Sequence, residues 1–228
     1  MNKMLFTGRM KLADLISANH ELIGMLPRFG IPLGFGDKSV AEICAIHGVP
    51  PDFFLLICNV YSFDTYLPDI KDIINIDMSP LVPYLTASHN SYKNVGLPHI
   101  EYHLNRIADG MNNKYGTVLK RFFAGYKNEV LEHFLYEEET VFPYINSLIN
   151  NEVNADFSIR NFEQVHNNIE DKLDDLKQII FKYMPSNTPQ GDSISVVLDI
   201  FHLSADLNKH TLIENKVLVP YVKSLEKK

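Results

Sequence analysis

Two stretches of the chain, 77 residues apart, carry the same pattern of chemically active residues. Each has a histidine, a glutamate four residues later and a proline six residues after the glutamate: His133, Glu137 and Pro143, then His210, Glu214 and Pro220. Chance would rarely supply such a set, and a fixed offset is the first feature to look for in a chain. The second half of the fold is therefore expected to copy the first.

Hydrophobic residues recur about every 3.6 positions along most of the sequence, and alternating runs typical of strands are nearly absent. The second part of the chain predicts four long helices, at residues 80–110, 115–149, 156–184 and 193–224. Asn, Gly and Pro mark the breaks between them. Short connections place successive helices antiparallel, so we expect an all-α protein built on an antiparallel four-helix bundle.

A smaller helical region is expected before the bundle. Its three short helices are predicted at residues 11–26, 39–47 and 51–62. Ser39 and Glu42 have the spacing of a capping box, which starts the second of them. The chain is thus predicted to have a small helical N-terminal domain at 1–62, an irregular linker at 63–78 and the bundle at 79–228.

Composition narrows the classes of function. The formal net charge of -7 and the absence of basic runs argue against nucleic-acid binding. Neither Cys44 nor Cys58 belongs to a CxxC pair, and two thiols in 228 residues suit a reducing cytosol. The apolar run at residues 53–60 is too short to span a bilayer, and the N-terminus lacks the apolar core of a secretion signal. We expect a soluble cytoplasmic protein with no membrane partner.

The same offset of 77 residues relates two further histidines, His89 and His166. A histidine and a glutamate four residues apart share one face of a helix. At about 1.5 Å rise per residue, all four histidines fall roughly 27–32 Å from their connecting turns, which is one level of the bundle. Six side chains could then meet as metal ligands: His89, His133, Glu137, His166, His210 and Glu214.

Imidazole and carboxylate together suit iron, zinc or manganese, and six ligands are too many for one tetrahedral zinc ion. Two carboxylates from facing helices can bridge two ions, as in di-iron bundles. A single histidine–glutamate pair would more often face solvent; the repeat favours metal. Glu129 and Asp206 lie one turn before their histidines and could accept their N–H groups, or could simply be solvated. His99 and His103 are also four apart, but nothing matches them at the offset.

Residues 79–228 resemble a hemerythrin-like domain of the family that repairs iron centres in bacteria. The segment Arg28-Phe29-Gly30-Ile31 resembles the small N-terminal domain of that family. The resemblance implies two non-haem iron ions per chain, held by the six residues named above. Whether an oxo group bridges the two ions is left open. It also implies adjacent cysteines after the Phe-Gly-Ile stretch, where this chain has Gly34 and Phe35. Any thiol-dependent step is therefore in doubt.

The resemblance implies a role in nitrosative or oxidative stress and in the repair of iron centres. The two irons would bind nitric oxide, O₂ or peroxide and, in an enzyme, would reduce nitric oxide or react with O₂ or peroxide. Two other functions remain open: a non-enzymatic sensor of O₂, NO or iron that signals through the N-terminal domain, and an iron-storage or donor protein. Expected partners are a small gas or peroxide and iron–sulfur proteins. Whether the chain forms a homodimer is left open.

Overall fold

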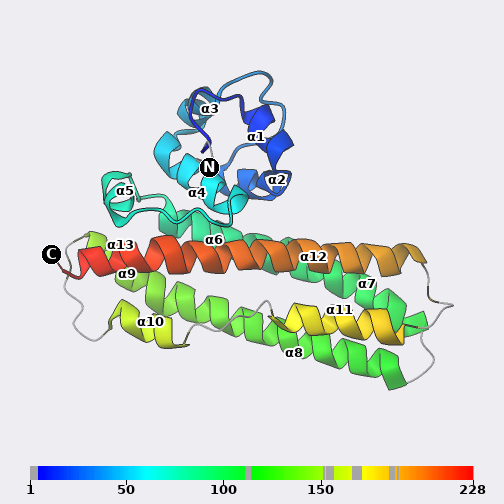
Figure 1. Cartoon of the computed structure of the whole chain (residues 1–228). Helices are drawn as coiled ribbons and strands as arrows, with labels where there is room; N and C mark the ends of the chain where they lie inside the picture. The colour runs from blue at the N-terminus through cyan, green and yellow to red at the C-terminus, as the bar shows by residue number, and fades with distance from the viewer. Residues whose placement is uncertain are drawn as a thin grey trace. The chain divides into compact units, whose positions relative to one another are not determined.

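The structure is a computed structural model that describes residues 5–110, 114–150, 152, 157–165, 171–184, 188 and 190–227. These residues form helices, and they contain no strand beyond one isolated bridge between Lys11 and Ser39 (Figure 1). The expected all-α fold is confirmed. Within this part of the chain, no helix is long and apolar enough to cross a membrane.

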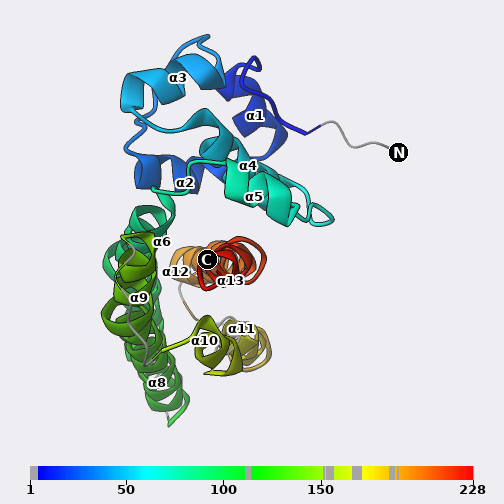
Figure 2. The same ribbon diagram turned by 90° about the vertical axis from the view of Figure 1, so that its left-hand side faces the viewer.

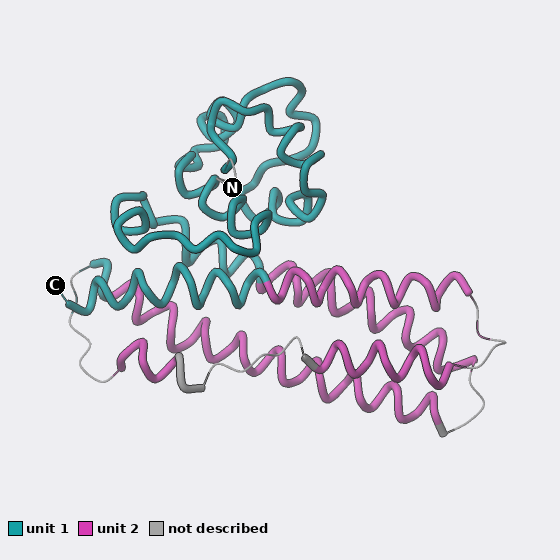
Figure 3. Tube along the Cα trace, in the orientation of Figure 1, with its two compact units in different colours: residues 1–88, 148–153, 209–228 teal, residues 89–147, 154–208 magenta. Residues whose placement is uncertain are grey.

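The chain divides into two compact units, coloured separately in Figure 3. One comprises residues 1–88, 148–153 and 209–228, and the other comprises residues 89–147 and 154–208. The predicted division into a domain at 1–62, a linker at 63–78 and a bundle at 79–228 stays a prediction.

The first unit begins with short helices: α1 (Leu12–Ala18), α2 (Leu22–Met25), a 3₁₀ turn (Leu26–Phe29), α3 (Val40–His47), α4 (Pro51–Ser62) and α5 (Ile70–Asn75). The single helix predicted at 11–26 is wrong, because the first helix ends at Ala18 and Asn19 is not helical. Asn19 adopts an extended backbone, its side-chain oxygen accepts from the N–H of Glu21, and its amide donates to Ser62. Asparagine competes for backbone hydrogen bonds in this way and interrupts helices.

Two further details test the N-terminal prediction. The capping box is confirmed, since Ser39 Oγ accepts from the backbone of Glu42 while the Glu42 carboxylate accepts from the backbone of Ser39. The segment expected to be irregular instead contains α5, whose first turn is capped by the Asp69 carboxylate. A six-residue helix is too short for hydrophobic periodicity to reveal it.

In the part of the chain that the structure describes, helix runs without a gap over residues 81–110, 114–149 and 190–225, close to three of the four predicted long helices. The fourth, predicted at 156–184, is described at 159–165 and 171–183. The α-helical segments are named in chain order. They are α6 (Leu81–Ser91), α7 (Leu97–Gly110), α8 (Lys114–Tyr136), α9 (Phe142–Ile149), α10 (Ile159–Val165), α11 (Asp171–Tyr183), α12 (Gln190–Ile213) and α13 (Val219–Leu225). Figures 1 and 2 show α11 alongside α8, and the two helices are in contact. α7 also packs on α8, where a side chain at Gly116 would lie 2.6 Å from the carbonyl oxygen of Ala108.

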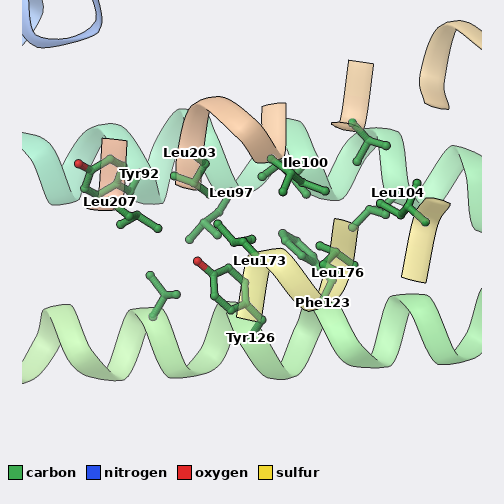
Figure 4. Packing of buried hydrophobic residues seen from close by; sticks show 14 of the residues in the cluster. Tyr92, Leu97, Ile100, Leu104, Phe123, Tyr126, Leu173, Leu176, Leu203 and Leu207 are labelled. Carbon is green, nitrogen blue, oxygen red and sulfur yellow. The ribbon is translucent and has the colours of Figure 1, made fainter. Parts of the chain in front are cut away.

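The core of the second unit is almost entirely apolar. Figure 4 shows side chains from α7, α8, α11 and α12 pointing toward one another, among them Ile100, Phe123, Leu173 and Leu203. Each of these four is at most 5% exposed. Apolar side chains repeating at helical spacing on each of the four helices therefore account for the association predicted from the sequence.

Candidate metal centre

Three helices change from α to π geometry close to the predicted ligands. The π turns are Tyr92–Gly96, Glu137–Val141 and Glu214–Leu218. The last two begin at the glutamates of the repeated motif, and the first begins three residues after His89. In each turn a backbone N–H reaches the carbonyl five residues earlier, for example from Phe142 to Glu137. Single π turns inside α-helices occur frequently at functional sites.

A proline follows each π turn by two residues, at Pro98, Pro143 and Pro220. Proline has no N–H, and its ring crowds the carbonyl four residues earlier, so it cannot sit comfortably inside a regular α-helix. That carbonyl lies within the π turn in all three cases, where the widened backbone relieves the crowding. The repeated proline thus explains why the two copies of the motif share the same local distortion.

The first copy of the motif gathers three predicted ligands. Glu137 is fully buried; its Oε2 lies 3.0 Å from Nε2 of His89, and its Oε1 lies 3.1 Å from Nε2 of His133. The second copy repeats the pair, with Nε2 of His210 lying 3.0 Å from Oε1 of Glu214. Both His210 and Glu214 are buried.

The His89 ring contacts two aromatic rings and a carboxylate. It stacks on Phe134 at a centroid distance of 4.1 Å and on Phe142 at 5.5 Å. Its Nδ1 lies 2.9 Å from Oε1 of Glu138. Burial raises the pKa of Glu138, but hydrogen bonds and charges from Lys93 and His89 outweigh it and leave that pKa below its usual value. Glu138 is therefore a carboxylate at neutral pH, and it accepts a hydrogen bond from the Nδ1–H of His89.

Four buried side chains each present one ligand atom within 4.8 Å of the others: His89, Glu137, His210 and Glu214. Burying two carboxylates costs free energy unless opposite charge compensates them. Imidazole and carboxylate oxygen together are donors that suit a divalent transition metal. This group of side chains could hold a metal ion.

The remaining predicted site residues are placed as follows. His133 lies beside Glu137, as described above. His166 lies outside the described residues. The half-exposed carboxylate of Glu129 accepts from Lys172, and its role toward His133 stays a prediction. The carbonyl of Asp206 accepts from the Tyr92 hydroxyl at 3.3 Å; its role toward His210 stays a prediction.

Sequence reasoning missed Glu138 and Lys93. Nζ of Lys93 lies 2.8 Å and 3.0 Å from the two carboxylate oxygens of Glu138. A signal was present, because Lys93 follows His89 by one helical turn and so shares its face. Among three consecutive glutamates, however, nothing in the sequence distinguishes Glu138 from Glu139 as the residue that turns toward His89.

The pair His99 and His103 contacts other groups of the second unit. Nδ1 of His103 lies 2.9 Å from Oδ1 of Asp192, which also accepts from Arg106. Nδ1 of His99 lies 3.9 Å from Asp199, and its side chain is 68% exposed. These contacts tie α7 to α12 near the surface.

The two cysteines are buried in the N-terminal helices. Burial raises the pKa of the Cys44 thiol to about 11 and that of Cys58 well above its ordinary value. Both thiols are therefore protonated at neutral pH, the unreactive form. This environment does not replace the adjacent cysteines that the sequence lacks.

A comparison with protein families identifies part of the chain. Residues 99–224 match the family described as hemerythrin HHE cation-binding domain. The matched segment includes both histidine–glutamate motifs and begins ten residues after His89. A search of curated proteins returned no matching relative.

Proposed function

Because the chain belongs to the hemerythrin HHE cation-binding family, we propose that it is a non-haem di-iron protein. The six ligands would be His89, His133, Glu137, His166, His210 and Glu214. The observation that carries the proposal is the buried group in which two histidines and two glutamates present ligand atoms within 4.8 Å. Bound iron would supply redox chemistry and a position at which a small molecule can coordinate.

Apolar side chains lie against the His89 ring. Phe134 and Phe142 stack against the His89 ring and give this side of the site an apolar wall. An apolar wall excludes water and favours small uncharged ligands. Nitric oxide, O₂ and peroxide fit this description, and we propose that they are the physiological ligands in a stress response that includes the repair of iron centres.

Metal analysis tests the proposal directly. Protein produced aerobically with iron is expected to contain about two irons per chain, because one tetrahedral ion would use only four of the six donors. The measurement is elemental analysis of the purified protein together with its optical spectrum. A fully loaded preparation that holds one zinc ion and no iron would overturn the proposal.

A second candidate is a non-enzymatic sensor of NO, O₂ or iron. It is favoured by the thiols, since Cys44 and Cys58 are buried, protonated and unsuited to electron transfer. The two functions differ in turnover. The iron-loaded, reduced protein would consume NO repeatedly if it is an enzyme, and would bind NO once per site if it is a sensor.

A further inference from the structure

A charged group lies behind His89, the first histidine of the site. In the first half, His89 uses both ring nitrogens: Nε2 lies 3.0 Å from Glu137, and Nδ1 lies 2.9 Å from Glu138. A carboxylate oxygen can only accept, so Nδ1 donates its N–H to Glu138, and Nε2 is the ring nitrogen that faces the ligand group. The stacked rings of Phe134 and Phe142 hold this orientation.

Glu138 is itself held from the other side. Lys93 donates to both of its carboxylate oxygens, at 2.8 Å and 3.0 Å. The side chains of Lys93 and Glu138 are 26% and 25% exposed, whereas His89 is fully buried. The partly exposed Lys93 therefore hydrogen-bonds to the carboxylate of Glu138, and this carboxylate hydrogen-bonds to the buried imidazole of His89. Each hydrogen bond restricts the orientation of the next side chain.

The repeat is broken at these two positions. The offset of 77 residues carries Glu138 onto Asn215 and Lys93 onto Glu170, although it carries every proposed ligand of the first half onto a ligand of the same type. Asn215 is exposed and has no charge to give an imidazole. The sequence therefore does not repeat the Lys93–Glu138 pair, because the offset places an amide where Glu138 stands and a carboxylate where Lys93 stands.

We infer that Glu138, held by Lys93, is a positioning residue that makes the metal ion bound by His89 the more tightly held of the two. This rests on the proposed two-metal function. A carboxylate that accepts the outer N–H of a metal-binding histidine fixes its tautomer and makes it a stronger donor, and losing it typically costs 10–100-fold in metal affinity. The two metal ions are then unequal, and they load one after the other.

Titration of the metal-free full-length protein with Co²⁺, followed by its optical absorption, tests the inference. The unchanged protein is expected to bind two Co²⁺ in separate steps. Glu138→Gln keeps the size and removes the charge, so it should weaken the tighter step roughly 10–100-fold and leave the weaker step in place. Glu138→Asp should restore part of the loss.

The neighbouring exposed residue supplies a matched control. Glu139→Gln removes the same charge one position away and should leave both steps unchanged. Lys93→Met should weaken the same binding step as Glu138→Gln, by a smaller factor. It replaces Glu138→Gln as the test variant if that protein fails to fold. Equal binding curves for the unchanged, Glu138→Gln and Lys93→Met proteins, or equal weakening of both steps, would overturn the inference. Binding of fewer than two Co²⁺ by the unchanged protein would instead count against the two-metal function.

Discussion

The two copies of the motif, residues 133–143 and 210–220, agree in backbone and differ in surroundings. Both pass from α to π geometry at the glutamate, and the histidine–glutamate distances are 3.1 Å and 3.0 Å. Behind the ligands, the first copy carries Glu138 where the second carries Asn215. The comparison teaches that the geometry of the ligands follows from a few repeated residues. The strength with which a ligand binds metal depends on neighbouring residues, and these differ between the two copies.

The largest expected effect comes from removing one histidine of each copy. His133→Ala and His210→Ala should each lose at least half of the bound metal, and by similar amounts, because the repeat makes the two side chains equivalent. The measurement is the metal content of each variant after identical loading. A large loss from one variant and none from the other would show that the equivalence exists only in the sequence.

A smaller effect is expected at Gly116, where α7 and α8 approach closely. Gly116 corresponds to Ser193 at the offset, and a Cβ at Gly116 would lie 2.6 Å from the carbonyl of Ala108. Gly116→Ala must push α7 and α8 apart, so it should lower the free energy of unfolding by about 1–3 kcal/mol. Urea denaturation of the metal-free protein measures this change.

Gly125 in the same helix is the control, since a Cβ there meets nothing within 4 Å. Gly125→Ala should raise the free energy of unfolding by about 0.5–1 kcal/mol through helix propensity. If both alanine variants stabilise the protein, the close approach of α7 and α8 at Gly116 is not a constraint.

The smallest effect concerns Asp192, whose counterpart at the offset is Tyr115. The hydrogen bond from His103 and the contacts of Arg106 lower the pKa of Asp192. A carboxyl with a lowered folded pKa stabilises the fold above its unfolded pKa of about 3.9, and this contribution is lost as the pH falls through the folded value. Asp192→Asn should therefore lower the melting temperature slightly at pH 6, and the difference should shrink toward pH 3.

Thermal unfolding of both proteins across this pH range checks the prediction. Asp174→Asn is a suitable control, because among the described residues Asp174 pairs with Lys177 on its own helix. A difference between the Asp192 variant and the unchanged protein that grows as the pH falls would contradict the assigned cause.

The sequence by itself determined the helical class, the repeat and the two histidine–glutamate pairs of the candidate metal centre. Helical periodicity is a local property, and a spacing of four residues places a histidine and a glutamate on one face wherever the helix lies. Prolines at a fixed distance after each motif also belong to the sequence, although the π turns that accommodate them were not predicted. The capping box of α3 could be predicted because all of its contacts span three residues.

Only the tertiary structure decided the contacts between residues distant in sequence. Glu138 meets His89 across 49 positions, Glu129 meets Lys172 across 43, and Asn19 breaks the first helix partly by bonding to Ser62. A carboxylate near one helical histidine looks the same in sequence whether it faces that histidine, a lysine on another helix or water. Its partner depends on how the helices pack, because hydrogen bonds and ion pairs are short-ranged and need the two groups within about 3 Å of each other.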